Sequence, residues 1–328
     1  MALSHFALLL PGNFTEAEPE IGLEESLQLF ELAEDLGFDS AWVRQRHLER
    51  GIGSAPVFLA AASQRCKRIG LGTAVIQLGY ETPFRLAEDL ALLDVLSRGR
   101  LEVGVSAGPA PFASFLGDLL PLKALGGGKY AQPEALARAL RAEPLSDQPI
   151  AGNAAGGQIP RLQPIAKGLG ARLWYGAGGQ ASALWAGQNG WNLLSGNVIS
   201  AEESEDFLTN QAQLVALWRA ALAAKGHSAR LGLGRVILPF DSADRTTRES
   251  YRAFAEARLA RTKQPNGPRR TLFLPDLIGG SQEILRALEA DPILPHADHL
   301  RLELPYDFSV QNYAQIMRDF IKLKGAIG

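Results

Sequence analysis

The sequence predicts an α/β fold of the (β/α)8 TIM-barrel type, with insertions after strands 4 and 7. Short apolar segments alternate with amphipathic helical ones along most of the chain, which is the pattern of parallel strands joined by crossover helices. Eight apolar segments fit this pattern, and that number favours a barrel over a doubly wound open sheet. A length of 328 residues suits one such domain, so we expect residues 1–328 to form a single domain.

The eight expected strands are short and apolar. They cover residues 5–10, 39–43, 68–75, 100–106, 171–176, 190–195, 233–239 and 299–305. Helices are expected between them and after the last strand, at residues 23–37, 55–67, 83–98, 180–189, 202–225, 243–262 and 309–324. The first helix has apolar residues at helical spacing and ends in Gly37, a typical C-terminal cap.

Two irregular regions interrupt this alternation. Residues 107–170 are rich in Gly, Pro and Ala and contain one expected helix near 131–142, and residues 262–280 form an irregular loop before the last strand. Because the loops at the carboxyl ends of barrel strands build the active site, we interpret both regions as candidate lids. A plain flexible linker is the alternative interpretation.

The composition indicates a small-molecule partner. The net charge is -2, with Lys and Arg scattered along the chain, which argues against nucleic acid and against an anionic membrane surface. The single Cys66 excludes an internal disulfide, and the first residues read as a strand rather than a signal peptide. No apolar run is long enough to span a membrane, so the expected location is the cytoplasm.

The helix expected at residues 83–98 has one charged residue beside its apolar face. Leu86 and Leu90 fall on that face, with Asp94 next to them. A carboxylate near an apolar face needs a partner, and Arg100 is the nearest plausible one in sequence. We interpret Asp94 as structural rather than catalytic.

The region around this helix resembles a known family. The stretch GTAVIQLGYETPFRLAEDLALLDVLSRGRLEVGV is similar to the corresponding segment of the bacterial luciferase-like flavin monooxygenases, which include the luciferase α-subunit. In that family a strand ending in Gly-Thr-Ala is followed by His/Thr-Pro, an acidic helix, Leu-Asp-x-Leu-Ser and Gly-Arg. The resemblance covers residues 1–106 and 171–240 well, and the region between them poorly.

The resemblance implies a barrel that binds FMN at its C-terminal mouth. Reduced FMN, supplied by a separate flavin reductase, would react with O2 to oxygenate a small organic substrate. Many family members pair through their second and third helices, so a homodimer is expected. An F420-dependent hydride-transfer oxidoreductase is one alternative, and a non-catalytic flavin-binding protein is another.

The resemblance also implies flavin contacts at the ends of strands three and four. The family often has a non-proline cis peptide bond against the flavin ring, and the matching bond here joins Ala74 and Val75. Ser106 stands where some members have a cysteine near the reactive flavin carbon. Ala107 stands where some members have an arginine for the phosphate.

The segment WYGAGGQASALWAG indicates a phosphate site. Glycines between a strand and a helix let backbone amides approach a phosphate, and the helix N-terminus favours its negative charge. By resemblance this is the FMN phosphate site, formed by backbone amides at Ala177, Gly178 and Gly179 and by the hydroxyl of Ser182. In the same segment, Gly176, Gly178 and Ala181 satisfy a weak dinucleotide fingerprint, and a mere tight turn is a third interpretation.

The segment WVRQRHLER after strand two supplies the remaining candidates. Luciferase-like enzymes often have Glu-His-His or a variant there, and this chain has Gln45, Arg46 and His47. His47 could act as an acid or base near neutral pH, or make a structural hydrogen bond. Arg46 replaces the histidine tied to catalysis in luciferase, and it could bind an anionic substrate or stay protonated beside the flavin.

No metal site is expected. The segment PHADH places His296 and His299 at a possible metal spacing, but it precedes strand eight at the stability face of the barrel.

Overall fold

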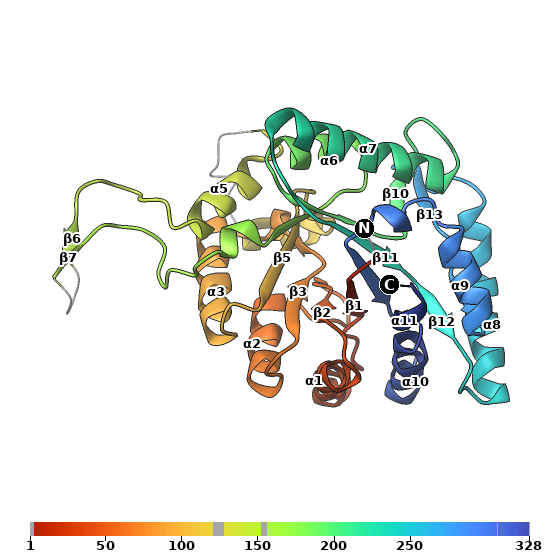
Figure 1. Ribbon diagram of the computed structural model, residues 1–328. Coiled ribbons are helices and arrows are strands. Elements are labelled where there is room, and N and C mark those ends of the chain that lie inside the picture. Colours follow the sequence, from red (N-terminus) through yellow and green to blue (C-terminus); the bar gives the residue numbers. More distant parts are fainter. Residues whose placement is uncertain (1–2, 121–127, 152–155, 307, 328) are drawn as a thin grey trace.

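The computed structural model describes residues 3–120, 128–151, 156–306 and 308–327, and shows a closed barrel of eight parallel strands (Figure 1). The strands are β1 (His5–Leu10), β2 (Ser40–Val43), β3 (Gly70–Thr73), β5 (Leu101–Ser106), β8 (Leu173–Gly176), β9 (Asn192–Ser195), β11 (Leu231–Arg235) and β15 (His299–Glu303). They pair in the order β3-β2-β1-β15-β11-β9-β8-β5, and pairing of β3 with β5 closes the ring. The predicted barrel and all eight predicted strands are confirmed.

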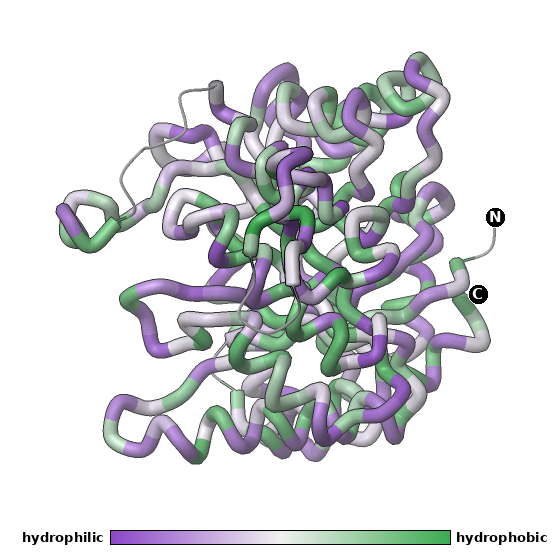
Figure 2. The backbone as a smooth tube through the Cα atoms, turned by 90° about the vertical axis from the view of Figure 1, so that its left-hand side faces the viewer, coloured by the Kyte–Doolittle hydropathy of each residue, from purple (hydrophilic) through white to green (hydrophobic). Residues whose placement is uncertain are grey.

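Helices surround the strands. The longer ones are α1 (Pro19–Leu36), α2 (Ala55–Arg65), α3 (Pro83–Leu96), α5 (Ala131–Leu140), α6 (Gln180–Gln188), α7 (Phe207–Lys225), α8 (Arg245–Leu259), α9 (Ser281–Glu289) and α10 (Val310–Ile321). In Figure 2 the outer helices alternate between hydrophilic and hydrophobic residues. This alternation lets each helix bury one face against the strands.

Short strand pairs extend the loops at the barrel mouth and beyond it. β4 (Ile76–Gln77) continues beside β5, β10 (Val198–Ser200) pairs with β13 (Thr271–Phe273), and β12 (Ile237–Pro239) pairs with β14 (Leu277–Gly279). β6 (Ile150–Ala151) and β7 (Gly157–Gln158) form a hairpin that projects away from the barrel in Figure 1.

The region 107–170 is only partly an insertion. Helix α5 buries Pro133, Leu136 and Leu140 and packs beside α3, so it is the regular barrel helix that follows the fourth strand. The extra chain is the segment before it, which includes α4 (Ala113–Leu116), and the β6–β7 hairpin after it. The sequence does not reveal that α5 is a regular barrel helix, because this ten-residue helix lies between long Gly-rich segments.

Two tryptophans fill the inside of the barrel. Trp42 and Trp174 pack edge to face, with ring centroids 5.7 Å apart, in a small cluster with Ala7, Leu9 and Leu194. Gly72 makes this possible because a Cβ atom there would lie 2.1 Å from Cδ2 of Trp42. The indoles plug the barrel, so any ligand must bind above them.

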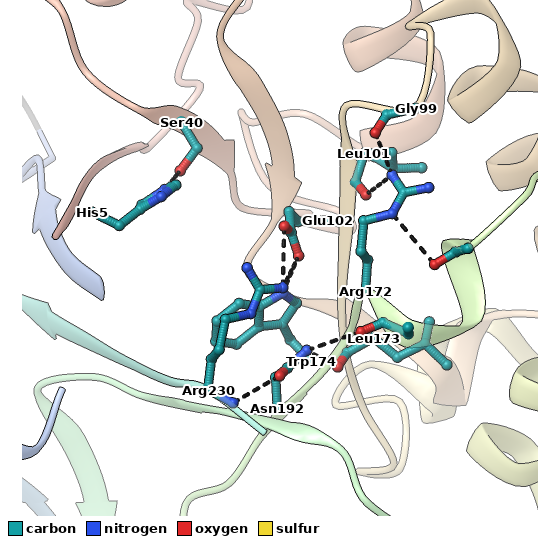
Figure 3. A network of polar contacts seen from close by, with 12 residues as sticks. His5, Ser40, Gly99, Leu101, Glu102, Arg172, Leu173, Trp174, Asn192 and Arg230 are labelled. Carbon is teal, nitrogen blue, oxygen red and sulfur yellow. Dashed lines mark hydrogen bonds and ion pairs between the residues drawn. The ribbon is translucent and has the colours of Figure 1, made fainter. Parts of the chain in front are cut away.

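A polar network that includes Trp174 lies at the N-terminal end of the barrel (Figure 3). Glu102 accepts hydrogen bonds from Trp174 Nε1 at 2.5 Å and from Arg230 Nη2 at 3.0 Å. The rings of His5 and His299 stack at 3.8 Å. Burial lowers the pKa of His5 to about 4 and that of His299 to about 2, so both rings are neutral at pH 7.

His299 belongs to this network and has a structural role at the end of the barrel opposite the mouth. His296 lies apart from it, on the surface, where Arg219 donates to its carbonyl oxygen at 2.7 Å. Within the described ranges, no group of three or more His, Cys, Asp or Glu side chains could hold a metal ion.

Asp94 is structural, but its predicted partner is wrong. Arg172, at the start of β8, donates to both carboxylate oxygens of Asp94 at 2.8 and 2.9 Å. Arg100 instead donates to backbone carbonyls, including those of Ile69 at 2.7 Å and Cys66 at 2.9 Å. Sequence proximity suggested Arg100, whereas the closed barrel brings β8 next to the end of α3.

Candidate functional site

A cavity of about 540 Å3 lies at the carboxyl ends of the barrel strands. The predicted site residues in its wall are Arg46, Ala74, Val75, Ser106, Ala177 and Gly178. The predicted residues His47, Gly179 and Ser182 lie outside the wall. The structure therefore brings the ends of strands β2, β3, β5 and β8 around one space, as expected for a barrel active site.

The end of β3 forms one side of this cavity. The peptide bond between Ala74 and Val75, for which the sequence left both isomers open, is cis, and the Ala74 amide donates to the Val43 carbonyl at 2.9 Å. Gly176, at the end of β8, allows close packing here because a Cβ atom there would lie 2.9 Å from Cγ1 of Val75.

Ser106 ends β5 in the cavity wall, and its hydroxyl makes no hydrogen bond to any described residue. The next amide, that of Ala107, donates to the hydroxyl of Tyr175 at 3.2 Å. Burial raises the pKa of Tyr175 to about 12, so this hydroxyl stays protonated. Ser106 is thus free to bond a ligand, whereas Tyr175 is a fixed neutral partner of the backbone.

Arg46 lies at the rim beside Tyr306. Its guanidinium lies over the Tyr306 ring at 5.1 Å and donates to the phenol oxygen, and its Nη1 pairs with Glu49 at 3.4 Å. Arg46 and Tyr306 also line a second cavity of about 840 Å3 beside α1. The pair therefore forms part of the partition between two cavities.

His47 follows Arg46 in the chain but lies outside the cavity wall, where it contacts other side chains. Its ring stacks on Tyr80 at 3.9 Å, and its Nε2 lies 3.0 Å from Nε2 of Gln45. The Ala55 backbone amide donates to Oε1 of Gln45 at 3.0 Å. The Nε2 group of the Gln45 side chain must therefore be the donor to His47 and to Glu81. Burial lowers the pKa of His47, which favours the neutral ring that accepts this bond.

The N-terminus of α6 holds a carboxylate in the structure. Oε2 of Glu202 accepts a hydrogen bond from the Gln180 amide at 2.7 Å, and a Cβ atom at Gly179 would lie 2.6 Å from Oε1 of Glu202. The Ser182 hydroxyl donates to the Gly179 carbonyl at 2.7 Å. Glu202 therefore occupies the position that the sequence assigns to a phosphate, and a phosphate bond from Ser182 requires its hydroxyl to turn.

The amides before α6 differ in what they already bind. The Ala177 amide donates to the Leu194 carbonyl at 3.2 Å and is not available. For Gly178 and Gly179, no described group accepts a hydrogen bond from the amide. These two amides, with that of Gln180, form a donor set for one oxyanion.

The two predicted lids differ in position. The loop at residues 262–280 supplies Phe273 to the cavity wall. The described part of residues 107–170 supplies no residue to it. A lid role for either region stays a prediction.

Sequence reasoning missed most of the charged residues in the cavity wall. These are Arg44, Arg258, Arg261, Arg301 and Glu303. A signal was present for two of them, because alternation in β15 places Arg301 and Glu303 on the same face as His299, opposite Leu300 and Leu302. Helix α8 carries Arg258, and the following turn carries Arg261.

Comparison with known proteins gives the family. The family model described as luciferase-like monooxygenase matches residues 1–275. The chain belongs to the luciferase-like monooxygenase family. Residues predicted from the GTAV and WYGAGG stretches thus lie within the matched part of a family member.

Relatives of the chain in this family are similar over part of their length. Limonene 1,2-monooxygenase of Rhodococcus erythropolis is 38% identical over 109 residues, which are 33% of this chain and 28% of that protein. 4-Hydroxyprotoasukamycin monooxygenase of Streptomyces nodosus subsp. asukaensis is 36% identical over 111 residues, 33% of this chain and 30% of that protein. The aligned segments thus span less than a third of either relative.

Solved structures share the fold over nearly the whole chain. Monooxygenase RslO1 from Streptomyces bottropensis has a TM-score of 0.73 at 22% identity, covering 97% of this chain and 98% of that one. The oxygenating constituent of 3,6-diketocamphane monooxygenase from Pseudomonas putida, in complex with FMN, has a TM-score of 0.69 at 15% identity, covering 98% and 97%. An F420-dependent secondary alcohol dehydrogenase has a TM-score of 0.63 at 14% identity, covering 99% of both chains.

No helix within the described ranges is long and apolar enough to cross a membrane.

Proposed function

We propose that this chain is a flavin-dependent monooxygenase that binds FMN at the barrel mouth and oxygenates a small organic molecule with O2. The cavity of about 540 Å3 at the carboxyl ends of the strands supports this proposal, since the chain belongs to the luciferase-like family. Its volume is in the range of cofactor and small-molecule sites. One neighbour of the same fold is solved in complex with FMN.

The residues at α6 fit an oxyanion such as the FMN phosphate. The amides of Gly178 and Gly179 have no acceptor among the described residues, and that of Gln180 already binds a carboxylate oxygen at 2.7 Å. A phosphate bound here would replace Glu202, which is exposed and can turn into solvent. The donor set therefore suits the group, and Glu202 competes for it.

The remaining wall supports binding and exclusion of water. Leu9, Leu194 and Val236 give the cavity apolar sides, and the Ser106 hydroxyl is free to bond the cofactor or the substrate. When bound, reduced FMN supplies the two electrons with which O2 gives one oxygen atom to the substrate and the other to water. The planar guanidinium of Arg46 can orient an anionic group by hydrogen bonds.

Reduced flavin must come from elsewhere in this proposal, and we assign that supply to a separate flavin reductase. The test combines two measurements. Quenching of flavin fluorescence on titration with FMN measures binding, and oxygen uptake with reduced FMN measures reaction. Saturable binding of one FMN per chain is expected, and absence of saturation at micromolar protein contradicts the proposal.

F420 is a second candidate cofactor, favoured by the arginines of the mouth. The glycine-rich segment WYGAGGQASALWAG contains no basic residue, but Arg258 and Arg261 lie in the cavity wall. An anionic cofactor tail would be attracted to them. Parallel titrations with FMN and F420 distinguish the two cofactors. A non-catalytic flavin-binding protein would bind flavin without changing its oxygen uptake.

We also propose a homodimer formed through α2 and α3. Large apolar side chains are about half exposed or more on the outer faces of these helices: Val57, Phe84, Leu92, Val95 and Leu96. Neighbouring exposed apolar residues mark interaction surfaces. Light scattering should give the dimer mass, and replacement of Leu92 and Val95 by Glu should give the monomer mass.

A further inference from the structure

The barrel mouth carries more positive than negative side chains. Arg46 forms an ion pair with Glu49 at the rim, so its positive charge has a negative partner. Four further arginines line the cavity, namely Arg44, Arg258, Arg261 and Arg301. Glu303 is the sole carboxylate that the described residues contribute to the same wall.

On the β15 side, two arginines share one carboxylate. Oε2 of Glu303 accepts from Arg44 at 2.6 Å, and Oε1 accepts from Arg301 at 3.3 Å. The side chains of Arg301 and Glu303 are only 5% and 4% exposed. The buried Nε of Arg301 has no hydrogen-bond acceptor among the described residues. The single charge of Glu303 thus pairs with two cations, the buried Arg301 and the partly buried Arg44.

On the α8 side, one arginine is paired and one is not. Nε of Arg258 lies 2.7 Å from Oδ2 of Asp276, and its Nη2 donates to Oδ1 at 3.0 Å. The guanidinium of Arg261 lies over the Phe273 ring at 4.3 Å, forms no ion pair with a described residue, and has a buried Nε without an acceptor. Asp276 is close enough to feel Glu303, whose charge adds to burial in raising the pKa of Asp276. The two clusters are therefore neighbours.

This arrangement lacks negative charge. Four arginines face two carboxylates, Asp276 and Glu303, in the described part of the chain. Buried charges in proteins are normally paired, because an unpaired one is costly. Burial accordingly lowers the pKa of both Arg261 and Arg301. An anionic ligand would supply the missing charge, and planar guanidinium groups suit a carboxylate or sulfonate.

We propose that these arginines bind the carboxylate or sulfonate of the substrate, so that the substrate class is a small organic anion with an apolar body. The apolar body would lie against Leu9, Leu194 and Val236, which line the same cavity. This inference rests on the proposed function, because it names the substrate class of that site.

The test compares ligands of equal chain length that differ in charge. Calorimetric titration of the FMN-loaded protein with hexanoate, hexane-1-sulfonate and hexan-1-ol should show both anions binding at least tenfold more tightly than the alcohol. The variant Arg261→Gln should weaken both anions at least tenfold and leave the alcohol unchanged. Arg261 has no ion pair to lose, so this variant is expected to fold.

A matched control is available on α8, the helix that precedes the turn carrying Arg261. Arg252 lies over the Phe240 ring at 5.0 Å and is not part of the mouth cavity. Arg252→Gln also removes one arginine charge, but outside the mouth cavity, and should leave all three affinities unchanged. Arg301→Gln tests the β15 side in the same way, with circular dichroism to verify its fold.

Several outcomes would overturn the inference. One is alcohol binding as tight as that of the anions, and another is unchanged anion binding in Arg261→Gln. A third is that Arg261→Gln weakens FMN but neither riboflavin nor hexanoate, because the arginines would then bind the cofactor phosphate. Failure of the proposed function is distinct, since it appears as no saturable FMN binding, while hexanoate can still be titrated into the flavin-free chain.

Discussion

Replacement of Glu202 by Gln should strengthen FMN binding. The Glu202 carboxylate accepts from the Gln180 amide at 2.7 Å, at the helix end where we place the FMN phosphate. Two charges about 4 Å apart in water interact by about 1 kcal/mol, and a phosphate carries a charge between about -1.5 and -2. Removing the competing carboxylate should therefore favour FMN by about 1.5 to 2 kcal/mol, which is about tenfold or more in affinity.

The assay is a fluorescence titration with FMN and with riboflavin, which lacks the phosphate. Glu202→Gln should bind FMN about tenfold more tightly, since repulsion of that size is removed, and should bind riboflavin as the parent chain does. Glu203→Gln is the matched control because Glu203 is an exposed neighbour whose carboxylate has no hydrogen bond to a described residue. An unchanged ratio of FMN to riboflavin affinity in Glu202→Gln would show that Glu202 does not compete with the FMN phosphate.

Three further predictions concern the scaffold. Arg172→Met should lower the free energy of unfolding by about 3 kcal/mol in urea, because it leaves the buried Asp94 carboxylate without its charged partner. Gly72→Ala should cost about 3 kcal/mol in the same assay, because the added Cβ would lie 2.1 Å from an indole atom. The free energy of unfolding should fall between pH 7 and pH 5, because two buried histidines stay neutral in the folded chain. The pKa values of His5 and His299 there are about 4 and about 2. Since the unfolded chain takes up protons near pH 6.5, each histidine should cost about 2 kcal/mol at pH 5.

Each of these predictions has a control. Arg245→Met removes an exposed ion pair and should change the unfolding free energy by less than about 0.5 kcal/mol. An equal loss in Arg172→Met and Arg245→Met would contradict the buried-pair argument. Gly108→Ala adds a Cβ into open space and should be neutral, unlike Gly72→Ala. His299→Gln should flatten the pH dependence, and an unchanged slope would exclude this histidine as its source.

The order of strands and helices could be predicted from the sequence because each is a local pattern. The alternation of apolar strands with amphipathic helices fixed the barrel, and the residues around Ala74 and Val75 pointed to the correct strand end. Helix α5 was expected at residues 131–142 but was assigned to an insertion. Its role depends on packing against α3, which its Gly-rich flanks do not reveal.

The charged contacts of the site could not be predicted because they join distant residues. Arg172 reaches Asp94 across 78 positions of sequence, and Arg44 reaches Glu303 across 259. Glu202 caps α6 from a loop that follows the next strand. Such pairs depend on how the barrel closes, so local spacing carries no signal for them. Alternation within β15 was the one local signal for an inward-facing Arg301.

The proposed function depends on FMN binding in the cavity at the barrel mouth. Its most direct test is an FMN titration of the parent chain and of Ser106→Trp, which places an indole in a wall position whose hydroxyl has no hydrogen bond to a described residue. We expect saturation at one FMN per parent chain and loss of that binding in Ser106→Trp, with the thermal midpoint preserved. Equal FMN affinity in the two proteins would contradict it, because the flavin would then bind elsewhere.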